Sequence, residues 1–335
     1  PGVPVIRAIR AGATEPVRIV GLAYDALDPG NYMQGVADDI YLMPYPSVGA
    51  DALFSRIREV HEQTPIDVLI PNLDAELPAY VRLVGRLGEL GIRTFLPSRE
   101  QLQMRAKDRF DQLQDEVGVR VPETVVMTEP GQIRQLDDRL TYPVMVKGQF
   151  YDAYIAYTPM DVEAHFQKVR ARWGLPVIVQ QYVAGEEFDV VAVGDGEGGL
   201  VGSVAMRKMQ LTDKGKAWGG ITVADRTLDA FVRDTIAKLK WRGPCEVEVM
   251  RASGDDELYI IEINPRFPAW VYLSVGAERN LPWATVQLAM GQDVAPMPPA
   301  RPGVMFLRHS FDQICTLSDY EALTVRGQLH REETS

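Results

Sequence analysis

Three acidic residues and one asparagine occur late in the chain with a spacing that suits cation binding. Glu246 and Glu248 lie two apart in one apolar run, and Glu262 precedes Asn264 by two in a second. Because side chains on a strand alternate between faces, Glu246 and Glu248 share a face. Carboxylates held close together repel each other unless a cation lies between them. With the amide oxygen of Asn264 they form an oxygen set suited to Mg²⁺ that is bound together with phosphates.

The segments that hold these residues have the pattern of a β-hairpin. Residues 245–250 and 258–263 alternate apolar and polar side chains, and the polar residues 252–257 separate them. This pattern predicts two antiparallel strands joined by a short loop. In that pairing Glu248 lies within cross-strand distance of Glu262. The alternative, acids on the solvated face of an ordinary hairpin, stays open on this pattern alone.

The run from Glu262 to Arg266, Glu-Ile-Asn-Pro-Arg, favours the cation site. Its proline ends the strand and pushes Asn264 toward extended geometry, which aims the amide and Arg266 at one place. The run resembles the Glu-x-Asn-Pro-Arg signature of the ATP-grasp superfamily, with the biotin carboxylase and carbamoyl-phosphate synthase branch as the nearest match. The resemblance implies that Glu248, Glu262 and Asn264 bind the metal of MgATP, with Glu246 as the alternative to Glu248. It also implies that Arg266 contacts phosphate or acyl phosphate.

Two lysines match positions that bind nucleotide phosphates in this superfamily. Lys107 lies in Ala-Lys-Asp-Arg-Phe, before a helix, a Gly-x-x-x-Pro run and a strand, which resembles the opening of an ATP-grasp domain. Lys147 ends the apolar strand 144–147, where a buried ammonium must find a partner. The resemblance implies that a triphosphate is that partner. A solvated helix residue and an edge-strand lysine are the alternatives.

Residues 177–189, Val-Ile-Val-Gln-Gln-Tyr-Val-Ala-Gly-Glu-Glu-Phe-Asp, resemble the hinge between the two ATP-grasp subdomains. Four adjacent positions match those whose backbone reads the adenine edge: Gln180, Gln181, Tyr182 and Val183. Gln180 stands where glutamate is common, and adenine recognition survives this exchange because an amide both donates and accepts hydrogen bonds. Glu187 matches the acid that binds the ribose hydroxyls.

The chain departs from the family pattern directly after Lys147. A glycine-rich loop normally closes over the phosphates there, whereas residues 148–156 contain one glycine and three aromatic residues. Tyr151 then covers the site or contacts the acceptor substrate, with a plain strand residue as the alternative. Among the nearby basic residues, Arg207 and Lys216 are expected to offset charge on the triphosphate or a substrate carboxylate. Ordinary surface charge is the alternative for both.

Residues 1–103 alternate strand and helix patterns, which predicts a parallel, doubly wound, Rossmann-like sheet. Strands are expected at 17–22, 40–43, 68–70 and 93–96, and helices at 5–10, 51–61 and 77–90. Because the sequence opens on a helix, the first strand of this unit is expected to be missing. Ligands bind beyond the carboxyl ends of such strands, so Asp74 is a candidate substrate residue. A helix N-terminal charge favoured by the dipole is the alternative for Asp74.

The expected fold class is α/β, becoming α+β in the ATP-grasp part. We divide the chain into a pre-ATP-grasp domain at 1–103, subdomain A at 104–178, subdomain B with the metal site at 179–300, and a strand and tail at 301–335 that pack back on the core. Further helices are expected at 98–113, 161–173, 228–239 and 280–290, and further strands at 177–180, 190–193, 199–206, 218–223 and 304–310. Residues after 326 are expected to be loosely ordered.

Composition sets the broad class. The 335 residues are 46% hydrophobic and 24% charged, which predicts a globular protein with more than one core. A net charge of −11 argues against non-specific nucleic-acid binding. We see neither an apolar run long enough for a membrane span nor a signal peptide. Cys245 and Cys315 lie in apolar runs, which fits a reduced, cytoplasmic setting.

The resemblance implies a two-step reaction, in which a carboxylate attacks the γ-phosphate of ATP and an amine then displaces phosphate from the acyl phosphate. We therefore expect a carboxylate–amine ligase that forms an amide or peptide bond. Its cofactors would be ATP and Mg²⁺ or Mn²⁺, and its partners a small carboxylate, a small amine and a second copy in a homodimer. The alternatives are a carboxylase or carbamoyl-phosphate-type enzyme that phosphorylates bicarbonate, and a nucleotide-binding module without catalysis.

Overall fold

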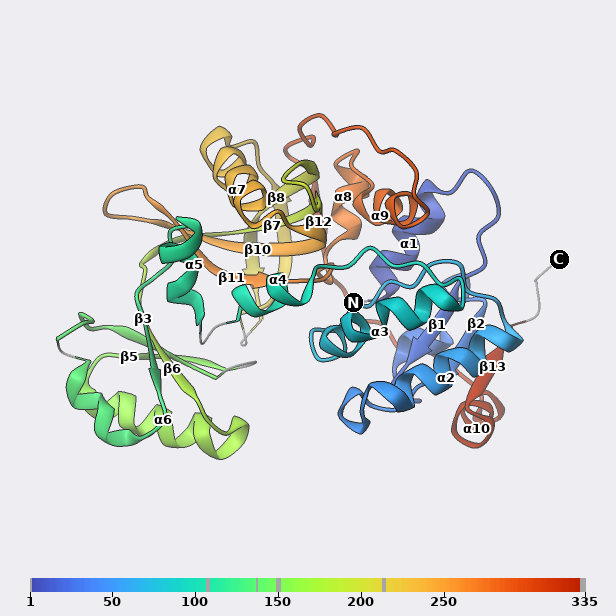
Figure 1. Ribbon diagram of the computed structural model, residues 1–335, viewed down its shortest axis with the longest axis horizontal. Coiled ribbons are helices and arrows are strands. Elements are labelled where there is room, and N and C mark those ends of the chain that lie inside the picture. The colour runs from blue at the N-terminus through green and yellow to red at the C-terminus, as the bar shows by residue number, and fades with distance from the viewer. Residues whose placement is uncertain (1, 107–108, 137, 149–151, 213–214, 332–335) are drawn as a thin grey trace.

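The computed structural model describes residues 2–106, 109–136, 138–148, 152–212 and 215–331. Its named strands form three sheets, of three, four and six strands. Figure 1 shows the six-stranded sheet between the other two, with the four-stranded sheet below it on one side and the three-stranded sheet on the other. The mixture of a small mixed sheet with two antiparallel sheets confirms an α/β fold in outline and corrects its first part, as described below.

The six-stranded sheet has the order β11-β10-β7-β8-β9-β12, and every pairing in it is antiparallel. Its strands are β7 (Gly185–Asp195), β8 (Leu200–Leu211), β9 (Ala217–Thr222), β10 (Arg242–Ala252), β11 (Leu258–Asn264) and β12 (Met305–Leu307). The predicted hairpin is confirmed, because β10 and β11 pair with Glu248 opposite Glu262.

Alternation along these strands builds two cores, one on each face of the sheet. Val190 packs in the cluster that includes residues of α7 (Arg226–Leu239), whereas its neighbour Val191 packs on the face covered by α8 (Tyr272–Gly276) and α9 (Leu281–Ala289). Glu187 and Asp189 of β7 lie at even spacing from Val191, and Glu246 and Glu248 of β10 are opposite Val191 and Asp189, so these four acids lie on the α8–α9 side of the sheet.

The four-stranded sheet has the order β3-β6-β4-β5 and is also antiparallel. It consists of β3 (Thr124–Met127), β4 (Val144–Lys147), β5 (Ala153–Ala156) and β6 (Val177–Gln181). One face packs on α6 (Pro159–Trp173), where Phe166 meets the buried valines of β4 and β6. In Figure 1, α6 lies on the side away from the six-stranded sheet, so the uncovered face is turned toward that sheet.

The N-terminal sheet is mixed rather than parallel and doubly wound, which corrects the sequence expectation. β1 (Val20–Ala23) pairs in parallel with β2 (Asp39–Leu42), and β13 (Gln328–His330) pairs antiparallel with the other edge of β2. The strands expected at 68–70 and 93–96 reduce to one isolated bridge between Val68 and Arg93. Proline residues directly follow both segments, and a proline has no N–H to extend the ladder.

The helices of the N-terminal unit pack against two different parts of the protein. α2 (Ala50–Gln63) and α3 (Leu77–Glu89) contribute to one apolar cluster with the small sheet. The first helix, α1 (Gly2–Gly12), instead packs against α8 and α9, where the Asn280 side chain donates to the Ala8 carbonyl at 2.7 Å. α1 therefore belongs to the junction with the six-stranded sheet, although we expected it inside the Rossmann-like unit.

The helix expected at 98–113 is wrong as a single element. The chain forms α4 (Arg99–Met104), capped by Ser98 as predicted, and a separate α5 (Phe110–Val117). α4 ends at Met104, and Arg105, directly after it, places its guanidinium 3.6 Å from Asp74. Phe110 and Leu113 of α5 then pack in the α7-side core of the six-stranded sheet.

The remaining elements are short or lie late in the chain: η1 (Pro29–Tyr32), η2 (Pro46–Val48), η4 (Pro130–Gln135) and α10 (Leu317–Arg326). The strand expected at 304–310 is the shorter β12, which pairs with β9. Residues 328–330 are not loosely ordered as expected, because β13 extends the N-terminal sheet. Within the ranges given above, no helix has both the length and the hydropathy to cross a bilayer. The domain boundaries that we inferred stay predictions.

We expect Gly243→Ala to lower the free energy of unfolding by about 3 kcal/mol. Gly243 has a φ of +87°, and an added Cβ would lie 2.5 Å from the Phe95 carbonyl oxygen. Urea unfolding measures the change. Gly85→Ala is the matched control, because Gly85 lies within α3 with nothing within 4 Å of an added Cβ. That variant should be equal in stability or slightly stabilised, since alanine favours a helix over glycine. Equal effects at both sites would contradict the expected close approach at Gly243.

Candidate functional site

An acid cluster lies where β7 and β10 run side by side. We define the acid cluster as Glu187, Asp189 and Glu248, whose carboxylate oxygens can lie within 4.8 Å of one another. The register places Glu248 directly opposite Asp189 on one side and opposite Glu262 of β11 on the other. Three neighbouring strands therefore present acids on one face. The sequence predicted this arrangement for β10 and β11 but not for β7.

One lysine side chain enters the acid cluster. Lys208 of β8 pairs with Glu187 through its Nζ, and the same Nζ lies 3.2 Å from Oδ1 of Asp189. Burial alone would lower the pKa of Lys208, but Asp189, Glu248 and Glu187 outweigh that effect and raise it above its ordinary value. Lys208 is therefore charged at neutral pH.

The acids remain short of positive charge in spite of Lys208. Burial raises the pKa of Glu248 well above its ordinary value, and Glu262 and Asp189 raise it further. Burial also raises the pKa of Asp189, with Glu246 adding to the effect and Lys208 opposing it. An additional cation would relieve this repulsion.

Arg266 lies beside the acids and is held by carboxylates from two different units. Its Nε donates to Oδ2 of Asp74 and one of its terminal nitrogens donates to Oε2 of Glu246, both at 2.9 Å. Burial would lower the pKa of Arg266, but Glu246 and Asp74 raise it. The second oxygen of Glu246 accepts from the Trp270 indole at 2.7 Å. Glu246 therefore orients Arg266, while Glu248 faces the acid cluster.

Asn264 joins these two groups of acids. Its side-chain Nδ2 donates to Glu248 at 3.1 Å and to Glu246 at 3.3 Å. An amide nitrogen does not bind a cation, so Asn264 would become a metal ligand only with its Oδ1 turned toward the metal. The structure brings Glu248, Glu262 and Asn264 together as predicted, with Asn264 acting as a hydrogen-bond donor.

Asp74 connects the N-terminal unit to this site. Besides Arg266, it pairs with Arg105, the residue that ends α4. Burial lowers the pKa of Arg105, although Asp74 and Glu262 oppose the shift. The nearby Glu76 instead accepts from the backbone amides of Asn72 and Leu73 and from the Tyr24 hydroxyl.

Lys147 and Gln180 meet on the face of the four-stranded sheet that α6 leaves uncovered. Lys147 Nζ donates to Gln180 Oε1 at 2.7 Å, and Gln180 Nε2 donates to the Thr124 hydroxyl at 3.0 Å. Gln180 is buried, and its amide uses both ends, as expected of the residue that replaces a glutamate. Lys147 therefore lies on the side turned toward the larger sheet, and its contact with the nucleotide phosphates stays a prediction.

The hinge residues connect the two antiparallel sheets. Gln181 ends β6 and hydrogen-bonds the backbone of Glu123, while Tyr182 and Val183 lie between β6 and β7. Ala184 then accepts from the backbone of Ser253, which ties the hinge to the β10–β11 turn. Glu187 belongs to the acid cluster, and its expected contact with the ribose hydroxyls stays a prediction.

Two predicted basic residues are not brought to the acids by the described contacts. Arg207 pairs with Glu186 and lies on the α7 side of β8, because it is opposite Phe188 in the register. Lys216 is exposed at the turn before β9. Lys107 and Tyr151 lie outside the described residues, so their predicted roles stay predictions.

Sequence reasoning missed Asp189, Arg105 and Trp270 as members of the site. Lys208 was one of the basic residues considered there, but Arg207 and Lys216 were favoured over it. A signal was present for Asp189, since Glu187 and Asp189 are two apart at the start of an apolar strand and must share a face. Lys208 lies on the same face of the sheet as these acids, but this can be seen only from the pairing of β7 with β8. Arg105 and Trp270 are brought in by tertiary packing, which no local pattern specifies.

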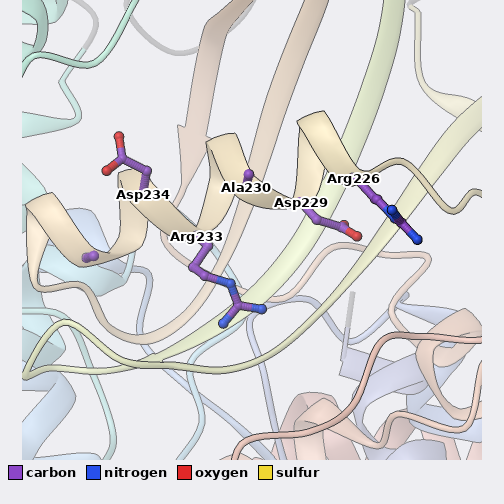
Figure 2. A pocket seen from close by; sticks show the side chains of 6 residues that line it. Arg226, Asp229, Ala230, Arg233 and Asp234 are labelled. Atoms are coloured by element: carbon purple, nitrogen blue, oxygen red, sulfur yellow. The ribbon is translucent and has the colours of Figure 1, made fainter.

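A hollow of about 490 Å³ lies elsewhere, on the surface of α7. Figure 2 shows Arg226, Asp229 and Arg233 along it, all from this one helix. α7 covers the face of the six-stranded sheet opposite the acid cluster. The hollow therefore has no part in the site described here.

The donor set fits a hard divalent cation. Every candidate ligand is a carboxylate or amide oxygen, the type that Mg²⁺ and Mn²⁺ prefer. The buried Oδ1 of Asp189 lies 3.2 Å from the Lys208 ammonium but receives no hydrogen bond from the described residues, so it has capacity left to bind a metal. The residues present therefore fit the metal that a nucleotide triphosphate brings with it.

The fold and the site define a protein in which two antiparallel sheets, joined by a hinge, carry lysine on one side and carboxylates on the other. Residues 110–269 match the family model described as an ATP-grasp domain. Residues 110–269 therefore form an ATP-grasp domain, and the coarse activity that this domain supports is that of an ATP-dependent enzyme.

Solved structures with similar folds come from several enzymes. Biotin carboxylase from Campylobacter jejuni, in its β-γ-ATP complex, has a TM-score of 0.71 at 14% identity over 90% of this chain and 71% of that chain. N5-carboxyaminoimidazole synthetase from Staphylococcus aureus has a TM-score of 0.66 at 16% identity over 88% and 76%. L-amino acid ligase from Bacillus licheniformis has a TM-score of 0.59 at 14% identity over 83% and 75%. These likenesses concern the fold.

Proposed function

We propose that this protein is an ATP-dependent carboxylate–amine ligase that forms an amide or peptide bond through an acyl phosphate. The observation that carries the proposal is the placement of Arg266 beside the acids. Its guanidinium is fixed by Asp74 and Glu246 next to Glu248, so a positive group that stays charged lies beside a place for a metal. A negatively charged carboxylate substrate and a triphosphate can meet there.

The residues divide the work between the two sheets. Lys147, and Lys107 by the family resemblance, would bind the phosphates, and the hinge backbone at 180–183 would bind adenine. Glu248, Glu262 and Asn264 would hold Mg²⁺ or Mn²⁺, with Asp189 close by. When bound, the metal offsets charge on the transferring phosphoryl group.

Arg266 would bind the substrate carboxylate and then the acyl phosphate that forms in the first step. A substrate carboxylate oxygen bonds to the γ-phosphorus, the bond from that phosphorus to the β–γ bridging oxygen breaks, and ADP leaves. The amine then bonds to the acyl carbon, phosphate leaves, and the amine loses a proton. Through both steps Arg266 holds the oxygens of the carboxyl and phosphoryl groups, as a planar donor that stays protonated. Lys216, at the turn before β9, is a further candidate for binding these negatively charged oxygens.

Phosphorylation of bicarbonate is the second candidate function. It is supported by the fold likeness to biotin carboxylase and N5-carboxyaminoimidazole synthetase, both of which have higher TM-scores than the L-amino acid ligase. Bicarbonate is itself a small carboxylate, so it would use the same contacts to Arg266. We also propose a cytoplasmic setting, since Cys245 and Cys315 are both free thiols.

The test is ADP release from MgATP with amino acids and small carboxylates, offered singly and in pairs. We expect release that needs both a carboxylate and an amine and that falls to background in Glu262→Gln. Mass spectrometry of the product should show the two substrates joined with loss of one water. Release with bicarbonate alone would instead support the second candidate. Release that survives in Glu262→Gln would contradict the assignment of this site to either reaction.

A further inference from the structure

Lys208 occupies the centre of the acid cluster. Its side chain is 9% exposed, and its Nζ contacts Glu187 and lies 3.2 Å from Asp189 Oδ1. Neither of these acids has another cation within ion-pair distance in the described part of the chain. The lysine therefore supplies part of the positive charge that the cluster requires.

The same carboxylates have the spacing of a metal site. The oxygens of Glu187, Asp189 and Glu248 lie within 4.8 Å of one another. Ligand oxygens around one octahedral Mg²⁺ or Mn²⁺ lie about 3 to 4 Å apart, so a small contraction would close them on one ion. An ion bound to these oxygens would lie within a few ångströms of the Lys208 ammonium, so the two cations would compete for the carboxylates of Glu187 and Asp189.

Asp189 indicates that the lysine satisfies the cluster incompletely. The Asp189 side chain is 4% exposed, and its Oδ1 receives no hydrogen bond from the described residues in spite of the nearby ammonium. A buried oxygen without a hydrogen bond is costly, whereas direct coordination to a metal would satisfy it. The cluster thus already holds the Lys208 ammonium, but a divalent metal would satisfy its carboxylate oxygens more completely.

We infer that Lys208 is the resident cation of the Glu187–Asp189–Glu248 set and that a divalent metal binds there only when the lysine moves out. The inference rests on the proposed function in taking this face as the MgATP site. Free metal is then opposed, because it must expel an ammonium into water. Metal that arrives on a triphosphate is favoured, because the phosphates give the expelled ammonium a new anionic partner. Lys208 would in this way make metal binding depend on the nucleotide.

The direct test is Mn²⁺ binding without nucleotide, measured by electron paramagnetic resonance of the free ion. We expect Lys208→Met to bind Mn²⁺ at least about tenfold more tightly than the unmodified protein. Lys208→Arg, which keeps the charge, should remain as weak as the unmodified protein. The matched control is Lys238→Met, since Lys238 pairs with Asp234 on the outer surface of α7 and should leave Mn²⁺ binding unchanged. Equal affinity in Lys208→Met and in the unmodified protein would overturn the inference.

A second measurement uses the unmodified protein and does not depend on the folding of a variant. Amine-reactive labelling followed by mass spectrometry reports the accessibility of each lysine. With increasing Mn²⁺ alone, we expect labelling of Lys208 to rise several-fold as the ion binds, while labelling of Lys238 stays constant. Tight Mn²⁺ binding without increased labelling of Lys208 would contradict displacement. Because neither experiment contains ATP or a substrate, a failure here is distinct from a failure of the ligase assay.

Discussion

Glu248→Gln is expected to lower the rate of MgATP-dependent ADP release about a thousandfold. The change keeps the size of the side chain but removes the charge that lies opposite both Asp189 and Glu262. The metal would lose a carboxylate ligand, and the transferring phosphoryl group would lose part of its charge compensation. The measurement is ADP release at saturating MgATP, with the substrates identified by the panel described above.

The same variant should be at least as stable as the parent protein, which separates a lost ligand from a lost fold. Burial, Glu262 and Asp189 raise the pKa of Glu248, so its ionised form is unfavourable in the metal-free folded state. A neutral glutamine removes that repulsion, and thermal unfolding of the metal-free protein should shift upward or not at all. Glu59→Gln, on the exposed surface of α2, is the matched control and should change neither property. Loss of activity together with a large fall in Tm would contradict the ligand role.

Asp74→Asn is expected to reduce the turnover number about a hundredfold while leaving the KM for ATP nearly unchanged. Asp74 accepts from Arg266 Nε at 2.9 Å, and their side chains are only 24% and 19% exposed. An asparagine keeps the shape but loses the charge that fixes the guanidinium. Arg266 would then turn away from the reacting groups, although the adenine and phosphate contacts would remain. Steady-state kinetics with ATP and each substrate varied in turn provide the measurement.

Asp51→Asn provides a matched control for that experiment. Asp51 also pairs with an arginine, Arg86, at 2.6 Å, but the Asp51 side chain is 92% exposed on the N-terminal unit. Surface pairs contribute little, so this variant should have the kinetics of the parent protein. If Asp74→Glu, which restores the charge, recovers part of the rate, the carboxylate itself is responsible. A rise in the KM for ATP with an unchanged turnover number would instead place Asp74 among the nucleotide contacts.

The hairpin and its acids could be predicted from sequence because the information is local. Alternation at residues 245–250 and 258–263 fixes which side chains share a face, and the β10–β11 register confirms Glu248 opposite Glu262. The polar turn between the strands fixes the pairing. The lysine at the end of β4 was predictable for a similar reason, since an ammonium at the end of an apolar strand needs a partner, and Gln180 provides one.

The contacts between separate units could not be predicted in the same way. Arg266 and Asp74 are 192 residues apart, and their contact depends on how the N-terminal unit packs on the six-stranded sheet. The break between α4 and α5 is also not visible in the local pattern. A periodic apolar pattern continues through residues 98–113, whereas α4 ends at Met104 and α5 begins at Phe110.

The N-terminal sheet shows a different limit of local reasoning. Residues 68–70 have the apolar, β-branched composition of a strand, yet they form one bridge before a proline. The third strand of the sheet comes instead from residues 328–330, a segment whose composition gave no strand signal. Which segment fills the edge of β2 was decided by packing of the whole chain.

That third strand has a consequence for how the protein is made. His330 Nδ1 lies 2.7 Å from Asp39 Oδ1 across a separation of 291 residues, and β13 pairs along the edge of β2. During synthesis on the ribosome, the N-terminal sheet must wait with that edge open until residue 330 has emerged. At about 5 to 20 residues per second, this delay lasts on the order of tens of seconds. Throughout this time the unpaired edge of β2 is a place where another chain could add a strand.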